Sequence, residues 1–170
     1  AAAIDAIAAT FGALPERRAA FDPRAEARLR EYAKDRSERT LIHKGPAEQA
    51  ELRVYWPARD DSDLAEAMKL NLLVRVMQLK LTEELREKLG ESYSPGAGAS
   101  LSDEFPGYGH LFAASNVDHK DLATTRAAIF AIAKELRDAP VDADLLDRAR
   151  KPLVEVMTKS RRENAYWLNY

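Results

Sequence analysis

Residues 85–94 join the end of the longest expected helix to the first strand of a hairpin, and they read Leu-Arg-Glu-Lys-Leu-Gly-Glu-Ser-Tyr-Ser. Upstream of this stretch, apolar residues recur every three or four positions, which is the period of a helix. Gly90 stands where a helix end commonly places glycine. Downstream, small residues alternate as they do in a strand. A long helix that leads into antiparallel strands is therefore the centre of the predicted fold.

The helix that Gly90 ends is expected over residues 61–89. Asp63, with Glu66 three positions later, is typical of a helix N-terminus. Two apolar stripes run along the helix, one made of Leu70, Val74, Met77, Leu81 and Leu85 and the other of Leu72, Val76 and Leu79. Because both faces are apolar, we expect the helix to pack against a sheet on one side and against another element on the other.

Strands are expected before and after this helix. Residues 52–56 alternate strictly between apolar and polar side chains, and Pro57 is expected to end that strand. The apolar members share one face: Leu52, Val54 and Trp56. Residues 92–102 and 108–117 flank the turn-forming residues 103–107, which predicts two antiparallel strands.

Two weaker strand signals accompany these. The β-prone run 40–43 predicts a further short strand, stopped by Gly45-Pro46. Gly96 and Gly98 would let another backbone approach the hairpin closely.

Helices are expected at both ends of the chain. Residues 1–11 predict one that ends at Phe11-Gly12, and residues 15–36 form a polar connection. Two helices follow the hairpin, separated by Ala139-Pro140, and residues 161–170 continue the helical pattern. The resulting order predicts an α+β fold with an antiparallel sheet, in a single domain over residues 1–170.

Composition excludes several classes of protein. The 170 residues include 26 basic and 28 acidic side chains and no cysteine, with a net charge of −2. Without cysteine there is no disulfide scaffold, Cys-ligated zinc, iron–sulfur cluster or catalytic thiol. The charge balance gives no general attraction to nucleic acid, and no apolar run is long enough to span a bilayer. The first residues lack a basic n-region, so no secretory signal is expected within this stretch, and we expect both ends to be those of a fragment of a longer protein.

Catalytic and metal-binding motifs are absent from the sequence. His43, His110 and His119 form no i, i+4 helical pair, and neither His-x-x-Glu-His nor its inverse occurs. A zinc site built on His110 and His119, nine residues apart on a strand and at its exit, would lack a nearby helical third ligand. There is no Gly-x-Ser-x-Gly elbow, and the Gly96-Ala97-Gly98 cluster lacks the lysine of a phosphate loop. No self-contained active site and no bound cofactor are therefore expected in this chain.

Residues 85–94 resemble the Leu-Arg-x-x-x-Gly-x-x-Tyr-Ser signature of zinc peptidases of the pitrilysin and insulin-degrading-enzyme type. That family also includes mitochondrial processing peptidase and the core subunits of the respiratory cytochrome complex. Further stretches resemble the family in the same order: Phe11-Gly12-Ala13-Leu14-Pro15, residues 44–50, 63–89, 142–151 and 163–167. The resemblance implies a C-terminal-type domain whose helices pack on one face of the sheet.

The resemblance also implies roles for two residues. In such peptidases an N-terminal domain supplies zinc, and a later domain contributes an Arg and a Tyr beside the metal. At the matching positions, Arg86 would bind the substrate backbone, because a guanidinium fork suits carbonyl oxygens. Tyr93 would donate a hydrogen bond to the oxyanion of the transition state. The implied partners are a peptide substrate and a zinc domain, in the same polypeptide or in another subunit.

Two functions from different classes remain open. The first is a non-catalytic, substrate-binding domain of a zinc metallopeptidase. The second is a structural or interaction module like the respiratory core subunits, with the apolar tail Tyr166-Trp167-Leu168 as a partner surface. Likeness to periplasmic members implies a periplasmic or secreted parent.

Overall fold

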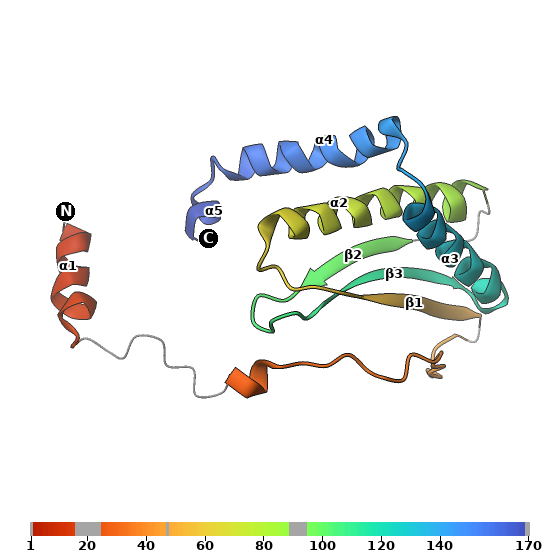
Figure 1. Ribbon diagram of the computed structural model, residues 1–170, viewed down its shortest axis with the longest axis horizontal. Helices are drawn as coiled ribbons and strands as arrows, with labels where there is room; N and C mark the ends of the chain where they lie inside the picture. Colours follow the sequence, from red (N-terminus) through yellow and green to blue (C-terminus); the bar gives the residue numbers. More distant parts are fainter. Residues whose placement is uncertain (1, 16–24, 47, 89–94, 169–170) are drawn as a thin grey trace.

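The computed structural model describes residues 2–15, 25–46, 48–88 and 95–168. Figure 1 shows one α+β body, from which the N-terminal helix stands apart. The helices and strands in chain order are α1 (Ala2–Thr10), β1 (Gln49–Ala58), α2 (Leu64–Leu81), β2 (Gly96–Leu101), β3 (Gly109–Asp118), α3 (Leu122–Asp138), α4 (Ala143–Ser160) and α5 (Asn164–Leu168). Short 3-10 turns occupy Phe11–Ala13, Ala25–Arg28 and His119–Asp121.

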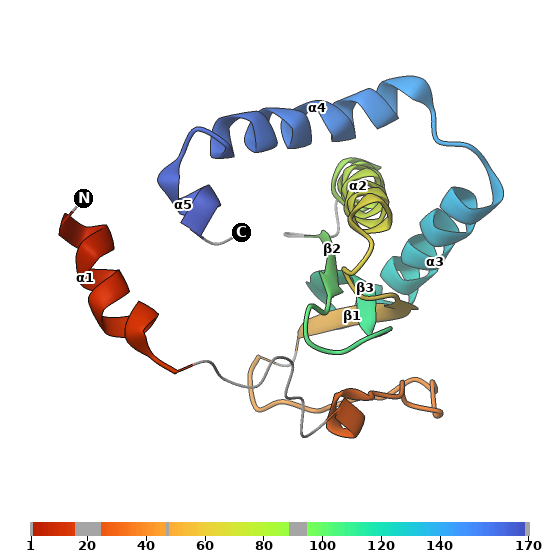
Figure 2. The ribbon, with the colours of Figure 1, turned by 60° about the vertical axis from the view of Figure 1, so that its left-hand side comes forward.

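The three strands form one antiparallel sheet in the order β1-β3-β2. Both strands of the hairpin predicted from the sequence are present, as β2 and β3. The strand before the long helix, β1, pairs directly with β3. Figure 2 shows the layers: the sheet, then α2 and α3 on one face, then α4 beyond α2. The predicted α+β class, with an antiparallel sheet, is confirmed.

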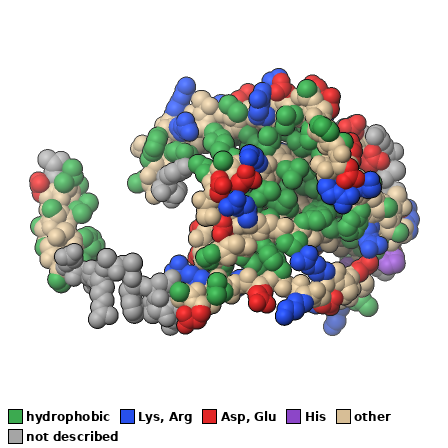
Figure 3. Space-filling view, in the orientation of Figure 1, with side chains coloured by type: hydrophobic (Ala, Val, Ile, Leu, Met, Phe, Trp, Pro, Cys, Tyr) green, Lys and Arg blue, Asp and Glu red, His purple; other side chains and the backbone are tan. Residues whose placement is uncertain are grey.

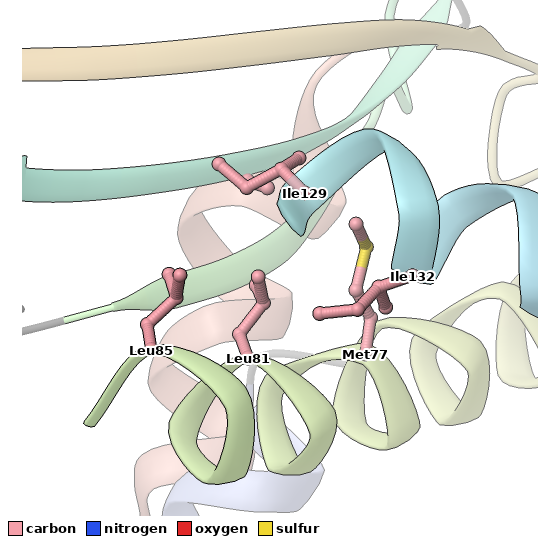
Figure 4. Packing of buried hydrophobic residues seen from close by; sticks show 6 residues of the cluster. Met77, Leu81, Leu85, Ile129 and Ile132 are labelled. Carbon is pink, nitrogen blue, oxygen red and sulfur yellow. The ribbon is translucent and has the colours of Figure 1, made fainter. Parts of the chain in front are cut away.

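The main core lies between α2, α3 and the sheet. Met77, Leu81 and Leu85 point from the long helix towards Ile129 and Ile132 of α3 (Figure 4). Leu52, Val54 and Trp56 pack against this cluster from β1, so the predicted apolar face of that strand is confirmed. Burying side chains of this size contributes about 1.5–3 kcal/mol each to folding.

The second apolar face of α2 is buried by α4. Val76 is fully buried with Leu145 and Ala149 of α4, and Leu72 and Leu79 pack beside them. The element expected opposite the sheet is therefore α4, whose N-terminus is capped by Asp142. A helix buried on two faces holds the sheet and the outer helix together.

The long helix begins as predicted but changes its winding. The Asp63 carboxylate accepts the Glu66 backbone N–H at 3.1 Å, which confirms the predicted N-cap. After Leu81 the backbone continues as a π-helical segment, Thr82–Lys88, instead of an α-helix. Wider turns of this kind are rare and often accompany functional sites. The predicted C-cap, Gly90, lies outside the described residues.

Two strand predictions are wrong in detail. Pro57 lies inside β1, because β1 is an edge strand and its missing N–H costs no ladder bond there. Residues 40–43 form no strand, since no neighbouring strand covers them and Leu41 and Ile42 are 90% and 96% exposed. Local β propensity alone does not make a strand without such a partner.

Gly98 permits a close contact of a different kind from the one expected. A Cβ at Gly98 would lie 2.6 Å from the Phe112 ring, so the neighbour is an aromatic side chain of β3 instead of another backbone. The tail also differs from its prediction, because the helical pattern breaks at residues 161–163 before α5.

The segment 25–46 runs past β1 on the side away from α2 (Figures 1 and 2). Tyr32 anchors it: its hydroxyl lies within hydrogen-bonding distance of the Ala58 and Gly109 carbonyls and accepts the Gly109 N–H at 2.9 Å. The Tyr32 ring stacks on Tyr108, with centroids 4.9 Å apart. This predicted connection is therefore tied to the strand ends by one aromatic residue.

Candidate functional site

The candidate site lies where the long helix ends and β2 begins. Arg86 belongs to the π-helical segment and directly follows Leu85, which is completely buried. Because Leu85 is held in the core, the backbone at Arg86 starts from a fixed point. The Arg86 side chain and the whole of Tyr93 lie outside the described residues. Their proposed contacts with substrate stay predictions.

Gln78 ties the two described ends of this region together. Its Nε2 donates to the Pro95 carbonyl at 2.8 Å, and its Oε1 accepts the Ala97 N–H at 2.7 Å. Nε2 also donates to Thr82 Oγ1 at 3.1 Å, while the Thr82 hydroxyl donates to the Gln78 carbonyl at 2.9 Å. Every polar atom of the Gln78 carboxamide is thereby bonded.

Sequence reasoning missed Gln78. An available signal was its uncharged polar side chain directly after Met77, on a helix expected to be buried on two faces. Such a residue needs hydrogen-bond partners, because an unsatisfied amide costs free energy when it leaves water. Two of its partners, Pro95 and Ala97, lie beyond the helix and could not be predicted from the helix pattern.

A groove lies beside the hydrogen bonds that Gln78 makes with Pro95 and Ala97. It holds about 470 Å³ and is bounded by α2, by Ala97, Gly98 and Ala99 of β2, and by α4. Arg75 of α2 and Arg148 of α4 line it, and Arg148 pairs with Asp144 at 3.5 Å. Since β2 has a strand on one side only, its other edge opens towards this groove.

The histidines are spread over different parts of the fold. His43 bonds its own loop, with Nδ1 accepting the Gly45 N–H at 2.9 Å and Nε2 lying 3.0 Å from the Gln49 carbonyl. His110 packs edge-on against Tyr55 on the open face of the sheet. His119 follows the end of β3 that lies away from His110. An extended strand between these two residues spans about 30 Å. Across the described part of the chain, no three His, Asp or Glu side chains gather as metal ligands.

One carboxylate with a shifted pKa lies in the loop between β1 and α2, against the turn between β2 and β3. Asp60 accepts hydrogen bonds from the Ser62 hydroxyl at 2.6 Å and from the Gly107 N–H. These bonds favour the ionised form and lower the pKa of Asp60 below its ordinary value of 3.8. Asp60 lies in the loop between β1 and α2 and bonds Gly107 of the β2–β3 turn, so this shift ties folding at low pH to that contact.

The structure defines an α+β domain with an antiparallel sheet. The sequence profile described as the Peptidase M16 inactive domain matches residues 1–153. The chain belongs to that family, as its resemblance to pitrilysin-type peptidases predicted.

A solved structure supports the same fold. It is a conserved protein from Enterococcus faecalis V583, with a TM-score of 0.62 and 16% identity over 83% of this chain. At that identity the similarity concerns the fold alone. The match takes in 32% of the Enterococcus protein, so the chain spans about a third of its length. No curated protein matches the chain. Among the described residues, no helix combines the length and apolar character needed to cross a membrane.

Proposed function

We propose that this chain is the non-catalytic, substrate-binding domain of a zinc-dependent metallopeptidase. The observation that carries the proposal is the family membership over residues 1–153, together with the motif residues Arg86, Gly90 and Tyr93 in order. A family of inactive domains implies that a catalytic domain or subunit supplies the chemistry. The proposal assigns the zinc to that other part, because this sequence contains neither His-x-x-Glu-His nor its inverse.

In this proposal Arg86 binds the substrate backbone and Tyr93 stabilises the transition state. Support comes from the fixed start of the segment at buried Leu85 and from its fixed end at Pro95 and Ala97. Preorganised donors lower a reaction barrier because they need no reorganisation as charge develops. The open edge of β2 offers backbone groups to an extended peptide beside the site.

The second candidate is a structural or interaction module of the same fold. The observation that favours it is apolar side chains exposed along α1 and along α4 and α5 (Figure 3). They include Ile4, Ile7, Phe11, Val154, Val156, Trp167 and Leu168. Such surfaces suit contacts with another protein or domain. A zinc motif encoded upstream in the parent gene, or in an adjacent gene, would favour the peptidase domain over the interaction module.

The test of the proposed function uses the full-length parent, or the complex with its zinc subunit. Tyr93→Phe is expected to lower kcat about 100-fold, the usual loss when one oxyanion donor is removed. Arg86→Ala is expected to lower kcat/KM for peptides, because it removes a charged hydrogen bond to the substrate. Tyr55→Phe and Arg150→Ala, on exposed surfaces elsewhere, are matched controls that should leave cleavage unchanged. Unchanged cleavage in both site variants would refute the assigned roles.

A periplasmic or secreted parent is part of this proposal and is tested by cell fractionation.

A further inference from the structure

We propose that the groove between α2, β2 and α4 binds an extended peptide segment that carries an acidic side chain: the segment pairs with the open edge of β2 at Ala99, and Arg75 and Arg148 bind its carboxylate. This inference goes beyond the proposed function, because the binding requires neither zinc nor the residues assigned to catalysis. It concerns only residues that the structure describes.

The open edge of β2 has backbone groups that no other described strand uses. Backbone groups alternate in direction along a strand, so those of Ala97 and Ala99 point away from β3 while those of Gly98 point towards it. The Gln78 side chain accepts the Ala97 N–H at 2.7 Å. Within the described part of the chain, the N–H and the carbonyl of Ala99 have no partner. Ala99 is therefore the first residue of β2 that an added strand could meet with both of its hydrogen bonds.

The sequence of β2 does not protect this edge. Exposed strand edges commonly carry lysine, proline or an inward-pointing charge that prevents pairing with another chain. β2 reads Gly-Ala-Gly-Ala-Ser-Leu over Gly96–Leu101 and contains none of these. Its small side chains also let another backbone approach closely. An edge of this kind is suited to the addition of a strand.

The register of an added strand places one side chain in the groove. Ala97 packs against the main core cluster, so Ala99, two residues further on, points to the same helix-covered face of the sheet. Both α2 and α4 lie on this side (Figure 2). In antiparallel pairing, residues directly opposite each other point to the same face. The peptide residue that exchanges both hydrogen bonds with Ala99 therefore extends its side chain between the sheet and the two helices.

The charge of the groove favours an acidic side chain at this position. The charged residues that line its described part are Arg75 of α2 and Arg148 of α4. Among the described residues, Arg75 has no ion-pair partner. Arg148 pairs with Asp144 at 3.5 Å, and because both side chains are exposed this pair contributes little. Both guanidinium groups are therefore available to a carboxylate, to which arginine donates paired N–H bonds.

The experiment is peptide binding to the full chain, followed by fluorescence anisotropy. The probe is a fluorescein-labelled Thr-Val-Thr-Glu-Thr-Val-Thr peptide, and the comparison peptide has Gln in place of Glu. The Glu peptide is expected to bind about tenfold more tightly, as one charge-assisted hydrogen bond allows. Arg75→Gln and Arg148→Gln should each remove most of this preference and leave the binding of the Gln peptide unchanged.

The matched control is Arg150→Gln, because Arg150 lies on the same helix as Arg148 but pairs with Asp147 away from the groove lining. It should leave both affinities unchanged. Since Arg75 and Arg148 are exposed, the two groove variants should keep the urea unfolding midpoint of the unmodified chain. A loss of binding in these variants is then a loss of contact with the peptide.

A second readout tests strand addition itself. Saturating Glu peptide should slow hydrogen exchange at the Ala99 amide, since that N–H gains an acceptor. Exchange at the Gly98 amide, which faces β3, should change much less. The two amides are neighbours in one strand, so the difference between them reports pairing at the open edge.

Each outcome decides the inference. A Glu preference that both groove variants remove, together with slower exchange at Ala99, supports it. Equal affinity for the two peptides, no binding at millimolar peptide, or an equal loss in Arg150→Gln would overturn it. So would competition by inorganic phosphate without slower exchange at Ala99, which would show an anion site without strand pairing.

A second copy of the chain is the other possible occupant. Exchange at Ala99 that slows with rising protein concentration, without peptide, would identify it and overturn the proposed peptide. None of these measurements depends on cleavage, so failure here is distinct from failure of the proposed function.

Discussion

Two polar side chains of α2 and α3 differ in whether their polar atoms have hydrogen-bond partners. The half-buried Gln78 amide has partners for both donors and its acceptor. Thr125 of α3 is completely buried, and among the described residues its Oγ1 has no hydrogen-bond partner. An unsatisfied buried hydroxyl costs about 1–3 kcal/mol, so Thr125 is a weak point of the core.

Thr125→Val is therefore expected to stabilise the chain by about 1 kcal/mol, because it removes the unpaired hydroxyl at nearly constant shape. Urea unfolding should show a higher midpoint with the same slope. The neighbouring Thr124 is exposed, and Thr124→Val is the matched control for any change in helix propensity. A lower midpoint for Thr125→Val would mean that the hydroxyl has a stabilising partner.

Asp60, in the loop between β1 and α2, makes the stability of its contact with the β2–β3 turn depend on pH. Its pKa is lowered when folded, mainly by the Ser62 hydroxyl, so its contribution is present above 3.8 and lost as pH falls through the folded value. Asp60→Asn should therefore lower the urea midpoint at pH 7 and make little difference at pH 2.5. Ser62→Ala should raise the pKa of Asp60, as followed by carboxyl NMR shifts. An equal loss at both pH values would point to a role without charge.

The long helix illustrates what pattern alone can predict at the scale of an element. Its two apolar stripes predicted both packing faces, because each stripe repeats at the helical period and needs its own cover. The pattern could not predict that residues 40–43 lack a partner strand or that Pro57 tolerates an edge, since both depend on the sheet order. The tie from Gln78 to β2 was missed for the same reason. Arg86 and Tyr93 were predicted as site residues from a sequence motif, and their contacts with substrate stay predictions.

Leu81 lies where the main core meets the π-helical segment and is completely buried. Leu81→Ala is expected to destabilise the chain by about 2–5 kcal/mol, through lost burial and the cavity it leaves. Leu64 begins the same helix and is 60% exposed, so Leu64→Ala should cost far less. Equal losses at the two positions, measured by urea unfolding, would contradict the assigned core.

In the molecule as a whole, the histidines and carboxylates of the described residues lie apart from one another. His110 lies near the start of β3 and His119 directly after its end, and no ligand cluster forms within the described ranges. The chain is therefore expected to retain well below one zinc per molecule after zinc loading and gel filtration, by elemental analysis. Stoichiometric zinc that His110→Ala and His119→Ala abolish would instead make this chain a metal site in its own right.

The family match shows an inactive peptidase domain. The proposed function adds that this domain contributes Arg86 and Tyr93 while another domain contributes the metal. The most direct measurement is kcat of the zinc-loaded parent, or of its two-subunit complex, with Tyr93→Phe against the unmodified protein. The account predicts a fall of about 100-fold in kcat with unchanged zinc content and an unchanged unfolding midpoint. An unchanged kcat, or a fall that follows loss of zinc, would contradict it.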